Sequence, residues 1–477
     1  MNGSILKNTF ALFLTNLLNP IVSFLLVLVI SRYLGVEGLG QYSLVMSYVA
    51  IFGALASLGL GSLLVREVAK RPESLHVLFS NAVLFGTVAS LITLLGMNAV
   101  VASMGYQREV VQASFILSLS LVVSTPAYFV ESVFRSVEKS EYIAVTGFIE
   151  NTVKVALCIL LAVLGYGIVP ICGVILATRV FALVLFIYFY VKVLGRPAWG
   201  FRPDIWLFLA REAPFFAGIV IFSTIHLSVD QIILSKLKSI EAVGIYSASD
   251  RLLSICKTFP LAFSSALLPF FTKEFSAGTA QLRDLSVASC RYMFLLALPL
   301  VAGTAILSDQ MINLIYGQKF SASGPLLTVQ IFSLIPFGLA YMFASVLIAT
   351  GNQKVDMTIN MVAALLNIAL NFVLISWLAE MGAVIATLTT IVVFHQLQVR
   401  YVRKHLFAIS FPPLMYKALL ATLIMGVVTY LMRDLHVLIN VAVSAAVYFV
   451  AALVLKALTP EEIRFLRGLL ATTSRMR

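Results

Sequence analysis

Long runs of apolar residues alternate with short polar breaks along the whole chain. Most runs approach the roughly 20 residues that an α-helix needs to cross a bilayer, and the breaks are too short to hold a separate soluble domain. The pattern predicts an all-α integral membrane protein with about 14 transmembrane helices. The first run, at 10–34, is too long for the core of a signal peptide, so we expect it to remain as the first helix.

One polar break occurs twice. The stretch ISRYLGVEGLGQYS at 30–43 is echoed 204 residues later by LSKLKSIEAVGIYS at 234–247. Each copy is a polar turn between two apolar runs, which indicates one helical hairpin used twice, at the start of two homologous halves. The offset spans six predicted helices, and an even number gives both halves the same orientation in the membrane. We therefore expect two parallel six-helix lobes around a central cleft, plus two C-terminal helices. The matched positions include Ser31 and Ser235, Glu37 and Glu241, Gly40 and Gly244, Tyr42 and Tyr246, and Ser43 and Ser247.

The breaks divide the chain into five predicted parts. The last part has Thr459, Pro460 and Glu462 at the spacing of a helix start with a capping box. Apolar residues then recur on one face beside arginines, which is typical of a helix lying on a membrane surface. The parts are an N-lobe of helices 1–6 at 1–194, a cytoplasmic inter-lobe linker at 195–211, a C-lobe of helices 7–12 at 212–405, two additional helices at 406–456 and a cytoplasmic amphipathic tail at 457–477.

Composition and charge support a membrane protein. The chain is 61% hydrophobic and 11% charged, whereas soluble domains have roughly a quarter charged residues. The net charge of +12 does not indicate a nucleic-acid partner, because most lysines and arginines fall in the loops on one side of the predicted membrane. Cytoplasmic loops collect lysine and arginine, so we expect both termini in the cytoplasm.

Four cations fall within predicted helices, where a central lysine or arginine costs about 2.5 to 3.5 kcal/mol on insertion scales. Lys154 and Arg179 belong to the first half, and Arg251 and Lys257 to the second. Cations from both sides of a cleft suit a polyanion such as a diphosphate, so these four are the predicted substrate-binding residues. Arg179 and Lys257 are the strongest candidates because no carboxylate lies three or four residues away. For Lys154, an ion pair with Glu150 four residues earlier is an alternative.

Ionisable groups inside the predicted helices are candidates for coupling to H⁺ or Na⁺. Asp230, Glu150 and His226 are in this group, and His226 precedes Asp230 by four residues on the same helical face. An ion pair between Asp230 and Arg251 is an alternative role. A later helix has three asparagines on one face, for which hydrogen bonds between helices are expected: Asn360, Asn367 and Asn371.

Several stretches in order resemble a known family. They are SRYLGVEGLGQYSL and LGLGSLLVRE in the first half, followed by LIYGQKFSASGPLL, IATGNQKVDMTINMVAALLNIALNFVLI and MGAVIATLTT in the second. Together they cover most of the chain. They are similar to the polysaccharide transporters, the oligosaccharide-lipid flippases of the multidrug/oligosaccharidyl-lipid/polysaccharide exporter superfamily.

The resemblance implies a two-lobed transporter that opens alternately to either side of the bacterial inner membrane. Its substrate would be an undecaprenyl-diphosphate-linked oligosaccharide, such as an O-antigen or another surface polysaccharide repeat unit, moved from the cytoplasmic to the periplasmic leaflet. Such transporters are thought to hold the diphosphate in a cationic cavity, and the four intramembrane cations fit by type and depth. Other implied partners are membrane lipids, an H⁺ or Na⁺ counter-ion, a polysaccharide polymerase and a chain-length regulator.

Three other functions remain open at this point. The two additional helices depart from the family's twelve-helix pattern and resemble the fourteen-helix lipid II exporters, so a lipid II flippase is one alternative. A multidrug exporter is less favoured, because intramembrane cations would repel its cationic substrates. A membrane polymerase or ligase is also disfavoured, because no external loop holds an acid–base constellation. The sequence has no metal-ligand spacing among its four cysteines, and we expect no metal or cofactor.

Overall fold

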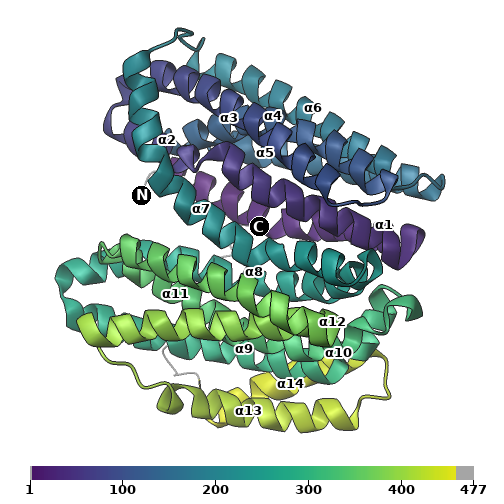
Figure 1. Cartoon of the computed structure of the whole chain (residues 1–477). Helices are drawn as coiled ribbons and strands as arrows, with labels where there is room; N and C mark the ends of the chain where they lie inside the picture. Colours follow the sequence, from purple (N-terminus) through teal and green to yellow (C-terminus); the bar gives the residue numbers. More distant parts are fainter. Residues whose placement is uncertain (1–2, 458–477) are drawn as a thin grey trace. The chain divides into compact units, whose positions relative to one another are not determined.

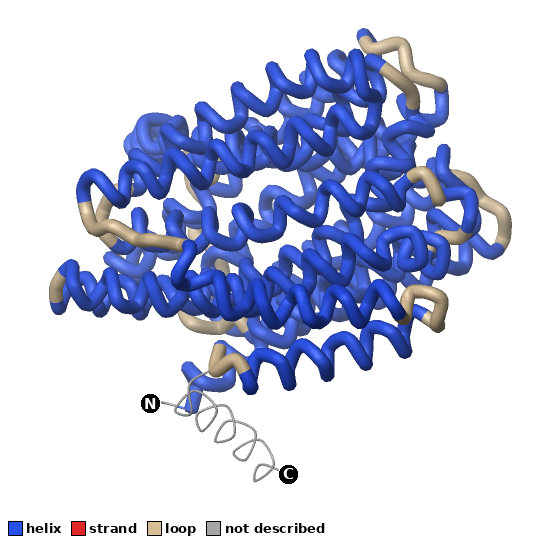
Figure 2. The backbone as a smooth tube through the Cα atoms, turned by 90° about the horizontal axis from the view of Figure 1, so that it is seen from below, coloured by secondary structure: helices blue, strands red, loops and turns tan. Residues whose placement is uncertain are grey.

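The computed structural model describes residues 3–457, with side chains described from residue 22 onward except at 215 and 219. The predicted amphipathic tail at 457–477 lies outside the described residues, apart from Ala457. The described chain is built from helices joined by short loops, without strands (Figure 2). The α-helices are α1 (Gly3–Ser57), α2 (Leu60–Lys70), α3 (Leu75–Ser103), α4 (Arg108–Ser136), α5 (Glu141–Val163), α6 (Ile168–Leu194), α7 (Pro203–Leu237), α8 (Ile240–Ala277), α9 (Thr279–Ile315), α10 (Ser323–Gln330), α11 (Leu334–Ala349), α12 (Gln353–His405), α13 (Pro412–Leu431) and α14 (Val437–Val454), with short 3₁₀ turns η1 (Pro72–Ser74), η2 (Gln318–Phe320) and η3 (Ile331–Ser333).

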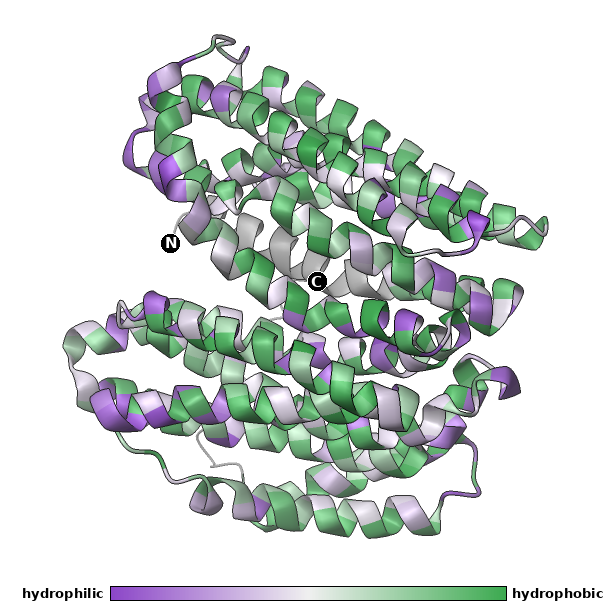
Figure 3. Ribbon diagram, viewed as in Figure 1, coloured by the Kyte–Doolittle hydropathy of each residue, from purple (hydrophilic) through white to green (hydrophobic). Residues whose placement is uncertain are grey.

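The described helices confirm an all-α, multi-pass membrane fold. Twelve helical stretches of this part of the chain are long and apolar enough to cross a membrane. Two of them, Val22–Lys70 and Gln353–His405, have 49 and 53 residues, whereas the others have 18 to 38. Each of these two is broken by a non-helical residue, at Gly35 and Ala379. Division at these breaks gives the predicted number of about fourteen crossings. Hydrophilic residues gather toward the helix ends, and the helices between them are mostly hydrophobic (Figure 3).

Both copies of the repeated stretch turn at the same point, as predicted. In the first copy α1 breaks at Gly35, whose φ of 71° is in the left-handed region that glycine adopts without steric cost. In the second copy α7 ends at Leu237 and α8 begins at Ile240, so the turn is at Lys238 and Ser239. Gly35 and Ser239 are matched positions of the repeat.

The two turns also pack against each other in a reciprocal way. A Cβ atom on Gly40 would overlap the carbonyl oxygen of Ile240, and a Cβ atom on Gly244 would overlap the carbonyl oxygen of Val36. Val36 and Ile240 are matched positions of the repeat, just as Gly40 and Gly244 are. Exchange of the two copies therefore reproduces the contact, which is the property of an interface with two-fold symmetry. Small residues are needed where helix backbones approach this closely.

The described chain forms two compact units, each of which is described separately. In unit 1, α4 packs against α3 and α6, and α1 packs against α5 and α7 (Figure 1). In unit 2, a buried core that includes Met342 and Phe343 joins α9, α11, the end of α12, α13 and α14. The lobe boundaries given above stay a prediction. Unit 1 comprises Met1–Arg251, Ile315–Phe320 and Asn360–Thr390, and unit 2 comprises Leu252–Leu314, Ser321–Ile359 and Ile391–Arg477.

Prolines explain two local departures from the predicted helix limits. The connection between α6 and α7 is non-helical only at 195–202 instead of over the whole predicted linker, because α7 already begins at Pro203. Proline suits this position, since the first N–H groups of a helix have no partner within the helix. The stretch 323–349 is divided into α10, η3 and α11, and Pro336 follows the break directly. A proline there removes one helical hydrogen bond.

Candidate functional site

Three of the four predicted substrate-binding cations belong to unit 1, where electrostatic contacts link Arg179 to each of two neighbours, Tyr42 and Lys154. Lys154 is on α5, Arg179 on α6 and Arg251 on α8. The buried side chain of Tyr42, on α1, is within electrostatic range of both Arg251 and Arg179. Lys154 is in turn within electrostatic range of Arg179. The fold therefore brings cations from both sequence halves to the surroundings of one tyrosine.

Arg179 is paired with a carboxylate from the neighbouring helix. Its Nη1 lies 3.1 Å from Oε1 of Glu150 and donates a hydrogen bond to Oε2 at 3.2 Å. The Glu150 side chain is only 6% exposed, whereas that of Arg179 is 44% exposed. The carboxylate is thus enclosed, while the guanidinium still has accessible surface for a second anion.

Lys154 does not form the ion pair that its spacing from Glu150 made an alternative. Its Nζ donates a hydrogen bond to Oδ1 of Asn151 at 2.6 Å, and Glu150 pairs with Arg179 instead. The local spacing was misleading because Glu150 has a stronger partner on α6, 29 residues further along the chain. Lys154 therefore has a neutral amide as its hydrogen-bond partner and stays within electrostatic range of both Glu150 and Arg179.

In the described part of the chain, neither Arg251 nor Lys257 forms an ion pair. Arg251 is half-buried and lies within electrostatic range of Tyr42. Lys257 belongs to unit 2, where its Nζ lies 5.2 Å from the ring centroid of Phe337. A cation–π contact of this kind stabilises an ammonium but does not neutralise it. Neither side chain therefore has a carboxylate within ion-pair distance in the described residues.

Asp230 of α7 is the centre of a second polar cluster in unit 1. It is 2% exposed and accepts hydrogen bonds from Tyr246 Oη at 2.8 Å, Thr387 Oγ1 at 2.7 Å and Asn371 Nδ2 at 3.0 Å. Asn371 and Thr387 lie on either side of the break at Ala379 in α12. Side chains of two other helices, α8 and α12, thus hold this carboxylate in position. A carboxylate surrounded by hydroxyl and amide oxygens is also the donor set that hard cations prefer.

The Asp230 cluster changes the other ion-coupling expectations. All three donors to Asp230 are neutral groups, so the alternative ion pair with Arg251 is not formed. His226 lies one helical turn earlier on α7 and contributes none of these donors. Glu150 is engaged with Arg179. The expected interhelical hydrogen bond from the asparagine face is confirmed for Asn371.

An apolar pocket with a volume of about 520 Å³ lies in unit 2, between α8, α9, α13 and α14. Its lining includes Cys256 and Phe259, which flank Lys257 in the sequence, and Met425 and Phe449 from the additional helices. A site for an apolar chain therefore adjoins the segment that holds one of the predicted cations. The sequence did not reveal the pocket, because its lining has the same composition as any other membrane helix surface.

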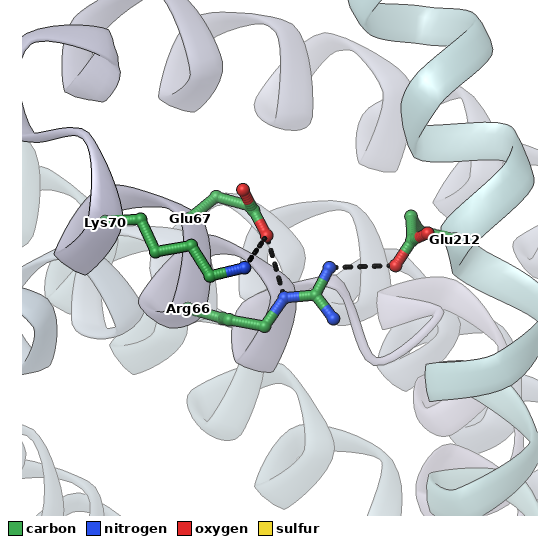
Figure 4. A network of polar contacts seen from close by, with 4 residues as sticks. All are labelled: Arg66, Glu67, Lys70 and Glu212. Carbon is green, nitrogen blue, oxygen red and sulfur yellow. Dashed lines mark hydrogen bonds and ion pairs between the residues drawn. The ribbon is translucent and has the colours of Figure 1, made fainter.

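A polar network ties α2 to α7 within unit 1 (Figure 4). Arg66 lies 2.8 Å from Oε1 of Glu67 through its Nε and 2.8 Å from Oε2 of Glu212 through its Nη2. Lys70 completes the network at 3.3 Å from Oε1 of Glu67. Arg66 is 42% exposed and Glu212 36% exposed. Exposed ion pairs contribute only about 0 to 1 kcal/mol, so the network is a weak tie.

Close backbone packing beside this network contributes more to the contact between α2 and α7. A Cβ atom on Gly59 would lie 2.6 Å from the backbone of Phe216, and Gly59 has a φ of 64°. We expect Gly59→Ala to lower the melting temperature of the purified protein clearly, because α2 and α7 must move apart. Glu212→Gln should lower it only slightly. If Glu212→Gln lowered the melting temperature as much as Gly59→Ala does, this ranking would be contradicted.

Comparison with known proteins agrees with the membrane fold. The profile of the polysaccharide biosynthesis protein family matches residues 5–275, and that of the MatE family matches residues 216–373. A search of curated protein sequences gave no significant match. Among solved structures, the chain is similar to the lipid II flippase MurJ in an inward closed conformation, with a TM-score of 0.80, 16% identity and coverage of 98% of this chain and 100% of that chain.

Multidrug transporters have the same fold over less of the chain. An inward-facing multidrug resistance MATE family transporter of the MOP superfamily has a TM-score of 0.65 and 14% identity, covering 82% of this chain and 98% of its own. An outward-facing structure of a multidrug resistance MATE family transporter has a TM-score of 0.62 and 12% identity. The match covers 84% of this chain and 95% of that chain. The MurJ match leaves about ten residues of this chain uncovered, fewer than either α13 or α14 contains. The additional helices are therefore part of the MurJ-like fold. Because the first profile spans more than half of the 477 residues, the chain belongs to the polysaccharide biosynthesis protein family, the polysaccharide transporters of the MOP exporter superfamily.

Proposed function

We propose that the protein is a flippase that moves a lipid-linked oligosaccharide across the membrane. The observation that carries this proposal is that Arg179 and Arg251, one from each sequence half, lie within electrostatic range of the same tyrosine, with Lys154 in range of Arg179. A substrate with two phosphates and a polar sugar must pass about 30 Å of hydrocarbon. Fixed cations along the path would replace the water that solvates the phosphates. Arg179 would contribute most, since its guanidinium presents several donors to a phosphate.

The apolar part of such a substrate also has a candidate site. The pocket between α8, α9, α13 and α14 is lined mainly by hydrocarbon side chains and adjoins the segment of Lys257. A prenyl chain would be accommodated there, beside the segment of α8 that holds Lys257. Family membership and the transporter folds of the similar structures favour transport over polymerase or ligase chemistry, and uncompensated cations disfavour cationic drugs as substrates.

The more specific assignment of substrate and transport direction is based on the family resemblance. The substrate would be an undecaprenyl-diphosphate-linked repeat unit of O-antigen or another surface polysaccharide, taken from the cytoplasmic to the periplasmic leaflet of a bacterial inner membrane. The charge asymmetry of the loops favours both termini in the cytoplasm. Six-helix lobes at 1–194 and 212–405 would open alternately, and a polymerase and a chain-length regulator would act on the delivered unit.

A lipid II flippase is a second candidate, and one observation favours it. The MurJ fold covers this chain through α13 and α14, whereas the multidrug transporters cover a smaller share. Binding of defined ligands to the purified protein separates the candidates. We expect tightest binding of an undecaprenyl-diphosphate-linked oligosaccharide and at least tenfold weaker binding of undecaprenyl monophosphate. Tighter binding of lipid II would favour the second candidate, and equal binding of the monophosphate would contradict the diphosphate site.

Asp230 is the proposed coupling residue for H⁺ or Na⁺. Asp230→Asn keeps the size of the side chain but removes its charge, so it should leave the protein folded and abolish the dependence of transport on the ion gradient. Transport by the purified protein in liposomes, with an imposed Na⁺ or H⁺ gradient, measures this effect. His226→Gln, on the same helix, is the matched comparison. Gradient-dependent transport by Asp230→Asn at the wild-type rate would contradict the assignment.

A further inference from the structure

A second pocket in unit 2 takes no part in the proposed transport path. It has a volume of about 240 Å³ and lies between α9, the first turns of α13 and the residues that follow α14. Three cations line it: Arg291, Lys417 and Lys456. No carboxylate is among its lining residues in the described chain. The remainder of the lining is mostly apolar, including Leu295, Leu414 and Ala418.

Hydrogen bonds hold the walls of this pocket in place. Nζ of Lys417, on α13, donates to the backbone carbonyl of Lys456 at 3.0 Å, so α13 is joined to the end of α14. Tyr448 Oη, on α14, donates to the carbonyl of Leu295 on α9 at 2.7 Å. The two hydrogen bonds therefore connect α13 to the end of α14, and α14 to α9. A site with fixed walls loses less entropy on binding than one on mobile side chains.

The surroundings place the pocket at the level of lipid headgroups. It lies at the beginning of α13, a candidate membrane span that starts at Pro412. Tyr416 is 50% exposed, and Nζ of Lys417 lies 6.0 Å from its ring centroid. Tyrosines and long cationic side chains concentrate where membrane helices meet the headgroup region. The pocket thus opens where both phosphate groups and the first part of an acyl chain are present.

We propose that this pocket binds the phosphate of an anionic phospholipid from the surrounding membrane. Basic pockets between membrane helices recognise such headgroups. Arg291 and Lys417 would contact the phosphate, and Leu295 and Leu414 would contact the glycerol and the start of the acyl chains. The lipid would join α9 to the hairpin of α13 and α14, and it would thereby stabilise the wall of the apolar pocket described above. This site is independent of the proposed transport substrate.

The test uses the purified full chain and fluorescent dioleoylphosphatidylglycerol in mixed micelles. Wild type should bind this lipid at least tenfold more tightly than dioleoylphosphatidylcholine. Arg291→Gln combined with Lys417→Gln should weaken binding by roughly tenfold or more, since each cation near an anionic surface contributes a several-fold effect. Arg291→Lys combined with Lys417→Arg keeps both charges and should retain binding. The matched control is Arg400→Gln with Lys404→Gln, which removes two exposed cations from α12 in the same unit.

Four results would overturn the proposal. One is equal binding of the phosphatidylcholine, and another is an equal loss of affinity in the α12 control. Competition by free glycerol 3-phosphate at the lipid's own concentration would show that phosphate alone is recognised. A tenfold gain in lipid affinity on Glu461→Gln with Glu462→Gln would show that the acidic residues of the C-terminal tail occupy the pocket. Unchanged lipid affinity in this last variant supports the lipid as occupant.

Discussion

Replacing both Arg179 and Arg251 by alanine is expected to abolish export of the polysaccharide, while the amount of protein in the membrane is maintained. Each guanidinium would lose a charge-assisted hydrogen bond to phosphate, worth about 1.5 to 3 kcal/mol. Together the two losses correspond to a reduction of roughly 100-fold or more. Surface polymer in a strain that lacks its own flippase measures the effect. Arg433→Ala, in the exposed connection between α13 and α14, should leave export unchanged.

The ion pair with Glu150 makes a second variant necessary. Removal of Arg179 alone leaves the buried carboxylate of Glu150 unpaired. The cost is about 3 to 5 kcal/mol for a fully buried ion pair and smaller here, because Arg179 is 44% exposed. Arg179→Gln combined with Glu150→Gln removes both charges and avoids this cost. If Arg179 served only to neutralise Glu150, the double variant would export normally. We expect it to fold and to remain inactive, because the phosphate has lost its donor.

Gly40→Ala and Gly244→Ala are expected to reduce transport strongly, each by the same mechanism. Either Cβ atom would overlap a backbone carbonyl of the other repeat copy, so the two turns would have to separate. Overpacking of this kind costs about 1 to 3 kcal/mol, which corresponds to a shift of roughly 5- to 150-fold in the population of the packed form. In the proposed alternating-access cycle, this contact would have to form and separate in turn.

The distance between matched positions of the repeat provides the readout. Spin labels at Glu37→Cys and Glu241→Cys, both exposed in the structure, should report a longer distance in Gly40→Ala than in wild type. Because either alanine alone separates the turns, transport by the double variant Gly40→Ala with Gly244→Ala should be only slightly lower than transport by each single variant. Gly53→Ala is the control on α1, since its Cβ atom would lie at an ordinary 3.6 Å from Leu121. Unchanged distances in Gly40→Ala would show that the glycine contact does not hold the turns together.

Features that depend on local sequence could be predicted well. The lengths of the apolar runs gave the membrane crossings, including those within α1 and α12, since each half of a broken helix still has to span the bilayer. The repeat located both turns at matched positions, Gly35 and Ser239. Glu131 and Arg135, four residues apart on α4, form an ion pair at 3.1 Å, as this spacing of opposite charges on a helix favours. These features depend on the geometry of a single helix.

Features that depend on how helices pack could not be predicted. The partner of Arg179 comes from α5, and the three donors to Asp230 come from α8 and from both parts of α12. Spacing along one helix contains no information on such contacts. The apolar pocket was missed for a related reason, because a helix surface that lines a pocket and one that faces lipid have the same composition.

The most direct test of the central claim is the rate at which a fluorescent undecaprenyl-diphosphate-linked oligosaccharide crosses liposomes that contain the purified protein. Accessibility of the label to an external quencher gives the rate. We predict rapid crossing with wild type, and crossing no faster than in protein-free liposomes with the neutral variant Arg179→Gln and Glu150→Gln. Crossing by that variant at the wild-type rate, or no crossing by a folded wild type that binds this lipid, would contradict a transport path built on these cations.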